Sequence, residues 1–179
     1  DPVSVETEID RVVPVIERLE GLDALVSVDT RKAAVAAAAL EAGADIVNDV
    51  SGLSDPEMRH VVAAHDAMLV VMHSLSAPVD PDRGVTYDDV LSDVLREIRE
   101  TVLLAEAAGI DRDRIIVDPG FGFGKSATES FELLGRLGEF RALGCPVLAG
   151  HSHKSMFGAI GEEPGECIEA TIAGTAIAV

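Results

Sequence analysis

Residues 118–125 read Asp-Pro-Gly-Phe-Gly-Phe-Gly-Lys and are the densest group of chemistry-bearing residues in this sequence. Their three glycines would let backbone amides approach a ligand closely. The Asp118 carboxylate could accept two N–H bonds from the amidine-like edge of a heterocycle, and Phe121 and Phe123, which we expect to be exposed, could stack on its face. The spacing fits neither a Walker A loop nor the G-x-G-x-x-G fingerprint. A glycine turn that only connects a strand to a helix is the alternative.

Residues 150–158 read Gly-His-Ser-His-Lys-Ser-Met-Phe-Gly. His151 and His153 would share one face of a strand, and together with Asp118 they could bind a metal ion. Lys154 could form a Schiff base if it is buried. Solvated loop residues are the third interpretation, and these residues alone leave the three open.

Residues 27–32 (SVDTRK) and 48–52 (NDVSG) are two weaker signals. Asp29 could bind a ligand or cap a helix, and Asn48 could bind a ligand or form a turn with its neighbour. The sequence has only three lysines, Lys32, Lys125 and Lys154, and all three lie in these segments. Because lysine is absent from the rest of the chain, its confinement to these segments favours a functional role for the three lysines.

The elements that must position these residues alternate between strand and helix. We expect strands at residues 25–29, 45–50, 67–72, 115–118 and 146–149, and helices near 5–20 (with Pro14 inside), 32–42, 55–64, 88–108, 130–143 and 165–178. A polar, proline-rich loop covers residues 74–87. This alternation predicts an α/β fold with a parallel sheet and polar side chains at the carboxyl ends of its strands. Five strands fit an open sheet or part of an eight-stranded barrel, with no domain boundary inside residues 1–179.

The composition limits the partners and the compartment. Fourteen Lys and Arg against 32 Asp and Glu give a net charge of −18, which argues against nucleic acid and anionic membranes. No apolar run is long enough to cross a bilayer. Cys145 and Cys167 form no CxxC motif, so we expect reduced thiols and a cytoplasmic protein. The acidity and the scarcity of lysine suggest a halophilic protein that works in concentrated salt.

Taken in order, these segments resemble dihydropteroate synthase, the pterin-binding family of folate biosynthesis. The matching segments are residues 28–32, 45–52, 72–73, 118–125 and 152–155. The resemblance implies a (β/α)8 TIM barrel, of which this chain would supply a partial barrel of about five β/α units, the third to seventh strands. Residues 1–179 would then be a single pterin-binding domain truncated at both ends, which agrees with a sequence that starts at Asp1 rather than Met.

The resemblance also implies a reaction. The family condenses 6-hydroxymethyl-7,8-dihydropterin diphosphate with p-aminobenzoate, releasing pyrophosphate and giving 7,8-dihydropteroate. Mg²⁺ assists the departure of pyrophosphate, and its family ligand would lie in the missing N-terminal part, so no metal ligand is expected in this chain. A homodimer is a further expectation.

Roles for single residues follow from the same resemblance. Asp29, Asp118 and Lys154 would be the catalytic residues. The substrate-binding residues would be Asp29, Asn48, Met72, Asp118, Gly122, Phe123, Lys154 and Ser155. Met72 would pack on the pterin plane, and Ser155, at a helix N-terminus, would receive the p-aminobenzoate carboxylate.

The sequence departs from the family pattern in two ways. His153 stands where the family usually has arginine, so a contact near p-aminobenzoate is altered. The family's first, second and last strands are missing. The chain would therefore keep the surface that binds the pterin and lack the segments that bind the diphosphate. Two alternatives follow: a pterin- or methyltetrahydrofolate-dependent methyltransferase on the same barrel, or a pterin-binding protein without catalysis.

Overall fold

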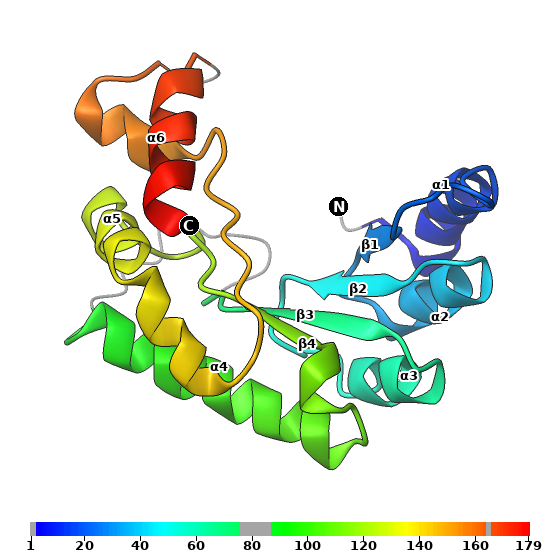
Figure 1. The fold of residues 1–179 in the computed structure, drawn as a ribbon. Coiled ribbons are helices and arrows are strands. Elements are labelled where there is room, and N and C mark those ends of the chain that lie inside the picture. The colour runs from blue at the N-terminus through cyan, green and yellow to red at the C-terminus, as the bar shows by residue number, and fades with distance from the viewer. Residues whose placement is uncertain (1–2, 76–86, 164–165) are drawn as a thin grey trace.

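The computed structural model describes residues 3–75, 87–163 and 166–179, and it is built around one parallel sheet (Figure 1). The strands are β1 (Ser27–Asp29), β2 (Ile46–Asp49), β3 (Met68–Met72) and β4 (Ile115–Asp118). They pair in chain order, β1-β2-β3-β4, without the reversal of strand order that marks a doubly wound sheet. The order is that of neighbouring strands in a (β/α)8 barrel, so the chain is a partial barrel.

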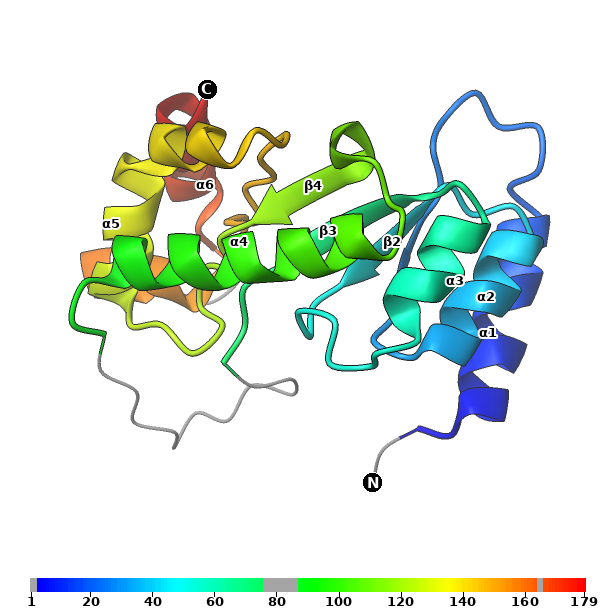
Figure 2. The same ribbon diagram turned by 90° about the horizontal axis from the view of Figure 1, so that it is seen from below.

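Helices precede, connect and follow these strands. They are α1 (Val5–Glu17), α2 (Ala33–Glu41), α3 (Met58–Ala64), α4 (Val90–Ala107), α5 (Ala127–Gly135) and α6 (Ile168–Ala178), with 3-10 helices η1 (Arg112–Arg114), η2 (Leu137–Leu143) and η3 (Ser155–Ile160). Figure 2 shows α1, α2 and α3 side by side and α4 running along β3 and β4. In the same view β4 points toward α5 and α6.

The core lies between the sheet and these helices. Val47 and Leu69 on the strands, and Val94 on α4, are fully buried in one apolar cluster. Burying each such side chain contributes about 1.5–3 kcal/mol. Because side chains alternate along a strand, the opposite face is free to carry Asp29 and Asn48, which pair in register across β1 and β2.

The fifth expected strand, residues 146–149, is wrong as a strand. This stretch runs beside β4 but pairs with it through the isolated bridge between Val117 and Val147. The Val117 N–H donates to the carbonyl of Pro146 (2.9 Å), and the Leu148 N–H donates to the carbonyl of Val117 (2.8 Å). Pro146 has no N–H of its own, so the ladder cannot extend in that direction.

Two helix predictions also need correction. The expected helix at residues 130–143 begins earlier, at Ala127, and becomes a 3-10 helix after Gly135. The expected start at Asp55 is also wrong, because α3 begins at Met58. One oxygen of the Asp55 carboxylate accepts from the N–H of Glu57 (3.1 Å), and the other accepts from the N–H of Ala33 (2.9 Å) at the start of α2. The predicted loop at 74–87 falls almost wholly outside the described residues.

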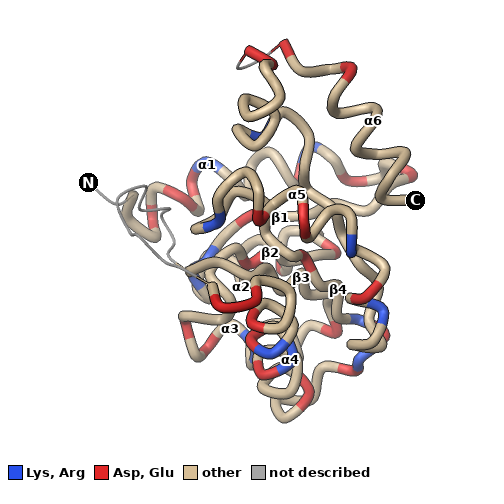
Figure 3. The backbone as a smooth tube through the Cα atoms, turned by 90° about the vertical axis from the view of Figure 1, so that its left-hand side faces the viewer, with Lys and Arg blue, Asp and Glu red and all other residues tan. Residues whose placement is uncertain are grey.

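The surface reflects the acidic composition. Figure 3 shows acidic residues spread over most elements of the described chain, with basic residues fewer and scattered among them. No helix in residues 3–75, 87–163 or 166–179 combines the length and the apolarity needed to cross a membrane.

Candidate active site

A pocket of about 340 Å³ opens where the strands end. It brings together six of the eight predicted binding residues: Asp29, Asn48, Met72, Asp118, Phe123 and Lys154. The sheet explains the gathering, because Asn48 lies beside Asp29 in the register of β1 and β2, and Asp118 lies beside Met72 in that of β3 and β4. Parallel strands end at one edge, so residues distant in sequence meet there.

Asp118 is the most buried carboxylate of this pocket. It is 7% exposed, and its Oδ1 accepts from the N–H of Gly120 at 2.8 Å. Burial raises the pKa of Asp118, whereas the Gly120 bond and the charges of Lys154 and Lys125 act in the opposite direction. Oδ2 lies beside Gly150, where a Cβ would come within 3.4 Å of it. A ligand N–H group can therefore approach Asp118 on the side that faces the pocket.

Asp29 and Asn48 form a second polar pair. The Asn48 side-chain amide donates to Asp29 Oδ2 at 3.1 Å. Burial raises the pKa of Asp29, while the Asn48 bond lowers it. The neighbouring Asp49 points to the other face, where it accepts from the N–H groups of Ser51 and Leu53. Asp49 therefore forms the turn that was the alternative role for Asn48, whereas Asn48 lines the pocket.

Lys154 and Phe123 line the pocket from segments that follow β4 in the chain. The Lys154 ammonium lies 4.4 Å from the centre of the Phe123 ring, a cation–π contact. Phe121 lines the pocket too, but it is 1% exposed and packs edge-on against His151, so the expectation of two exposed rings is wrong. Only Phe123 of the pair presents a partly exposed ring, because the two side chains alternate across the loop.

Gly122 and Ser155 stand just outside the pocket lining. The Gly122 N–H donates to the hydroxyl of Ser130 on α5 (3.2 Å), and its φ of +77° is one that glycine adopts without strain. Ser155 opens η3 after Lys154, and its hydroxyl would lie 4.0 Å from a Cβ placed on Gly122. Both residues therefore border the pocket from the Lys154 side.

The two histidines of residues 150–158 point to different partners and do not converge. His151 is buried and contacts the carbonyl of Thr171 (3.2 Å) and the hydroxyl of Thr175 (3.1 Å) on α6. His153, with φ +52°, turns its ring toward the thiol of Cys167 (3.5 Å). Within the described residues, no group of three His, Cys, Asp or Glu side chains is placed to hold a metal ion. The metal-site interpretation of these histidines is therefore wrong.

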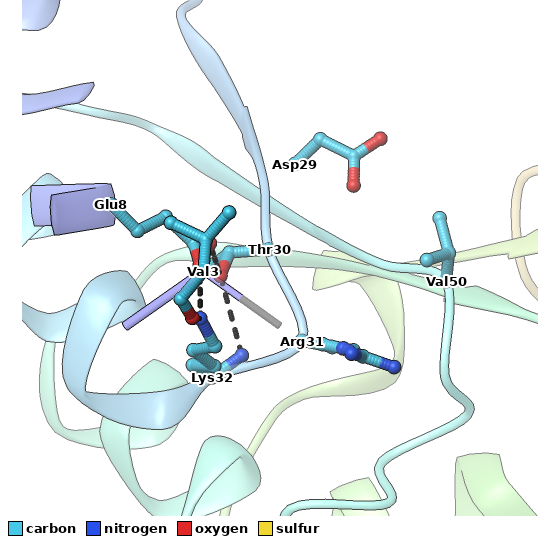
Figure 4. Close-up of a pocket in the computed structure, with 7 residues that line it drawn as sticks. All are labelled: Val3, Glu8, Asp29, Thr30, Arg31, Lys32 and Val50. Atoms are coloured by element: carbon cyan, nitrogen blue, oxygen red, sulfur yellow. Dashed lines mark hydrogen bonds and ion pairs between the residues drawn. The ribbon is translucent and has the colours of Figure 1, made fainter. Parts of the chain in front are cut away.

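A second pocket, of about 310 Å³, adjoins the first and shares Asp29 and Val50 with it (Figure 4). Lys32 lies in this pocket, but its ammonium contacts Glu8 of α1 (2.6 Å) and the carbonyl of Val3. Figure 4 shows Asp29 turned away from Lys32. Lys32 therefore joins α1 to the segment after β1, and of the three lysines Lys154 alone lines the 340 Å³ pocket.

The sequence favoured a functional role for Lys125 without specifying one, and it assigned no role to His73. The structure buries both, with Lys125 Nζ 2.9 Å from His73 Nδ1. Gly150 and Ser152 also line the pocket without having been singled out. Their position next to Lys154 was the available signal, whereas nothing local connects Lys125 with His73, 52 positions away.

The pattern of the whole chain matches a family model described as pterin binding enzyme over residues 1–179. The chain belongs to the pterin-binding enzyme family. Among curated members, it is 67% identical over 178 residues to a probable bifunctional folylpolyglutamate synthase/dihydropteroate synthase of Haloferax volcanii, covering 99% of this chain and 21% of that protein. It is 37% identical to the dihydropteroate synthase of Escherichia coli, covering 98% of this chain and 63% of that protein. The chain thus spans a fifth to under two thirds of these relatives.

Solved structures of the family share the fold. The dihydropteroate synthase of Xanthomonas albilineans in complex with 7,8-dihydropteroate matches with a TM-score of 0.88 and 42% identity, covering 99% of this chain and 68% of that one. A dihydropteroate synthase from Stenotrophomonas maltophilia matches with a TM-score of 0.94 and 38% identity, with the same coverage. At these identities the pterin-binding enzyme fold extends over the described chain.

Proposed function

We propose that this chain forms the pterin-binding part of a dihydropteroate synthase. That enzyme joins 6-hydroxymethyl-7,8-dihydropterin diphosphate to p-aminobenzoate, giving 7,8-dihydropteroate and pyrophosphate. The observation that carries the proposal is the single pocket that gathers Asp29, Asn48, Asp118 and Lys154 at the strand ends. The relatives named dihydropteroate synthase, and the Xanthomonas structure with bound 7,8-dihydropteroate, support it.

The pocket matches the edges of a pterin. Asp118 accepts hydrogen bonds from the pterin amino group and a ring N–H, which form an amidine-like pair of donors. Lys154 donates to the acceptor edge of the ring. The side-chain amide of Asn48 can both donate and accept a hydrogen bond. Met72 and Phe123 supply apolar surface against the ring faces. Buried polar partners of this kind fix the orientation of a planar ligand, because a wrong orientation leaves them unpaired.

The chemistry then follows from charge. As the bond between the pterin methylene and the diphosphate oxygen breaks, positive charge develops on the methylene and spreads into the pterin. The carboxylates of Asp29 and of the buried Asp118 stabilise that charge. The amine of p-aminobenzoate attacks the methylene, forms the new C–N bond and loses a proton, while pyrophosphate carries away the bonding electron pair. No protein nucleophile is required.

We place the p-aminobenzoate carboxylate near Ser155, at the start of η3. Ser155 borders the pocket beside Lys154, so a ring held there would present its amine toward the pterin methylene. His153, which stands where the family usually has arginine, turns toward Cys167. The contact with p-aminobenzoate therefore depends on Ser155 and not on residue 153.

Condensation activity of the full-length gene product tests this function. With pterin diphosphate and p-aminobenzoate we expect equal amounts of 7,8-dihydropteroate and pyrophosphate. Absence of both products would reject the synthase. Methyl transfer from methyltetrahydrofolate to a corrinoid protein would identify the methyltransferase instead, and pterin binding without either reaction would identify a binding protein.

Magnesium belongs to the proposal as a requirement of the whole enzyme. The described residues offer no cluster of three ligands for it. When bound, Mg²⁺ neutralises charge on the diphosphate and eases its departure. We therefore expect EDTA to abolish condensation while leaving pterin affinity of the pocket unchanged, and added Mg²⁺ to restore turnover. A pterin affinity that also falls in EDTA would place the metal in this pocket.

We also propose a cytoplasmic homodimer. Both cysteines are free and buried, as is usual in a reducing compartment. Helix α6 exposes Ile168 and Ile172, one turn apart on the same face, and we propose that a second copy covers this apolar surface. Sedimentation of the full-length gene product at the mass of one chain would contradict the dimer.

A further inference from the structure

Lys125 lies behind the pocket wall and does not line the pocket. It is 8% exposed, and its Nζ donates to two carbonyl oxygens of the loop in front of it, those of Gly120 (2.9 Å) and Phe123 (3.2 Å). We call residues 119–124 the glycine loop. Three of its residues have φ near +70°. A loop of this shape directs carbonyl groups inward, and a buried carbonyl needs a donor.

The amine also reaches the end of β3. Its Nζ lies 3.3 Å from the carbonyl oxygen of His73 and 2.9 Å from His73 Nδ1. The other ring nitrogen, Nε2, lies 3.0 Å from the carboxylate of Glu97 on α4. Since Lys125 donates to Nδ1, the ring proton resides on Nε2 and is donated to Glu97. The chain of contacts therefore runs from α4 through β3 to the glycine loop.

The glycine loop and the end of β3 are in very close contact. A Cβ placed on Gly120 would lie 2.0 Å from the carbonyl oxygen of His73. Two carbonyl groups that face the same small space repel each other unless a donor lies between them. Lys125 is that donor, because it contacts the carbonyl oxygens of both Gly120 and His73.

We propose that Lys125 is a positioning residue, which holds the glycine loop against β3 so that Asp118 and Phe123 take the orientation that binds pterin. The proposal rests on the pterin-binding function proposed above. Two contacts transmit the position: the Gly120 N–H donates to Asp118, and the Phe123 ring faces Lys154. Lys125 itself does not line the pocket.

The Lys125→Met variant tests this role in the full-length gene product. Methionine keeps most of the volume and removes the donors. Calorimetry with 6-hydroxymethyl-7,8-dihydropterin should show a Kd at least about tenfold higher than that of the wild type, since several buried hydrogen bonds are lost. Arg112→Met is the matched control, because Arg112 also donates to a backbone carbonyl, that of Leu143, at the opposite end of β4. The control should keep the wild-type Kd.

A general loss of stability would look different. It would lower the binding stoichiometry and leave the Kd of the folded fraction unchanged, and that result would overturn the proposal. Steady-state kinetics should agree, with KM for the pterin substrate raised and KM for p-aminobenzoate near the wild-type value. Hydrogen exchange adds a test that needs no pterin: amides of the glycine loop should exchange faster in Lys125→Met only. Unchanged loop exchange would reject the proposal even if the proposed reaction fails.

A milder variant covers the case in which Lys125→Met does not fold. Glu97 is partly exposed on α4, so Glu97→Ala should fold, and it releases the ring of His73. We expect a Kd for the pterin a few times higher than that of Glu100→Ala, one turn along the same helix and exposed. Equal affinities for the two variants would contradict the proposed chain of contacts.

Discussion

Asp118 is the residue on which the proposed pterin recognition depends most. It is buried and has a fixed bond to the Gly120 N–H on one side. Asparagine has nearly the same shape but presents an NH2 group that faces the N–H donors of a pterin. We expect Asp118→Asn to abolish measurable pterin binding in calorimetry, a loss of at least about 2–3 kcal/mol for a charged hydrogen-bond partner. Retained affinity would refute the role.

His73 and Lys125 make stability depend on pH. Burial lowers the pKa of His73 to about 3, with the charge of Lys125 acting in the same direction, and burial lowers the pKa of Lys125 to about 7. Between pH 3 and about 6.5, and again between pH 7 and about 10.4, the unfolded chain holds a proton that the folded chain does not. The free energy of unfolding therefore rises with pH in both windows, by at most about 1.4 kcal/mol per pH unit for each group.

Urea unfolding at pH 7, 8 and 9 checks the upper window. The wild type should gain stability over this range, and Lys125→Met should lose that gain because methionine does not titrate. A wild-type stability that falls from pH 7 to pH 9, or a variant with the same rise, would show that the Lys125 proton is not coupled to folding.

The site residues could be predicted from sequence where strand ends reveal them. Asp29, Asn48 and Asp118 each follow a short apolar run, and the edge of a parallel sheet collects such residues. The buried contact of Lys125 could not be predicted, because only the pairing of the strands brings its partner His73 near it. The burial of Phe121 was not predicted for a different reason. The glycines of the loop do not indicate which of its side chains points toward the core and which toward the pocket.

At the level of elements, α5 is the helix whose start is best defined. Ser126 accepts from the N–H of Glu129 (3.2 Å), and the Glu129 carboxylate accepts from the Ser126 N–H, a capping box. Removing it should cost about 1 kcal/mol of stability. Ser126→Ala should therefore unfold at lower urea than the wild type. Thr128→Ala, exposed on the same helix, is the control; equal midpoints for the two variants would mean that the cap contributes nothing.

The expected elements succeeded where local sequence decides the structure. Helix α4 begins at Val90, directly after its capping residue Asp89, and ends at Ala107, close to the expected bounds. The segment at 146–149 failed because Pro146 has no N–H to donate, so its pairing with β4 stops at the single bridge between Val117 and Val147. Helix 130–143 failed because helix propensity continues past Gly135, whereas packing of Phe140 and Leu143 imposes the tighter η2.

At the scale of the whole molecule, the net charge of −18 governs solvent behaviour. Repulsion among dispersed carboxylates weakens when salt shortens the screening length from about 10 Å at 0.1 M to about 3 Å at 1 M. If the protein is halophilic, as we propose, its Tm should rise between 0.1 M and molar KCl. A Tm that stays constant or falls would contradict the halophilic interpretation and indicate an ordinary acidic protein. NaCl at equal ionic strength separates screening from an effect specific to potassium.

The close approach of Gly120 to the carbonyl of His73 has a consequence for inhibition. Any side chain at position 120 would collide with backbone, which cannot move aside as a flexible side chain can. Gly120 also lines the pocket. An inhibitor that makes its main contact at this position would therefore meet a target with no tolerated substitution, so resistance would have to arise elsewhere in the pocket.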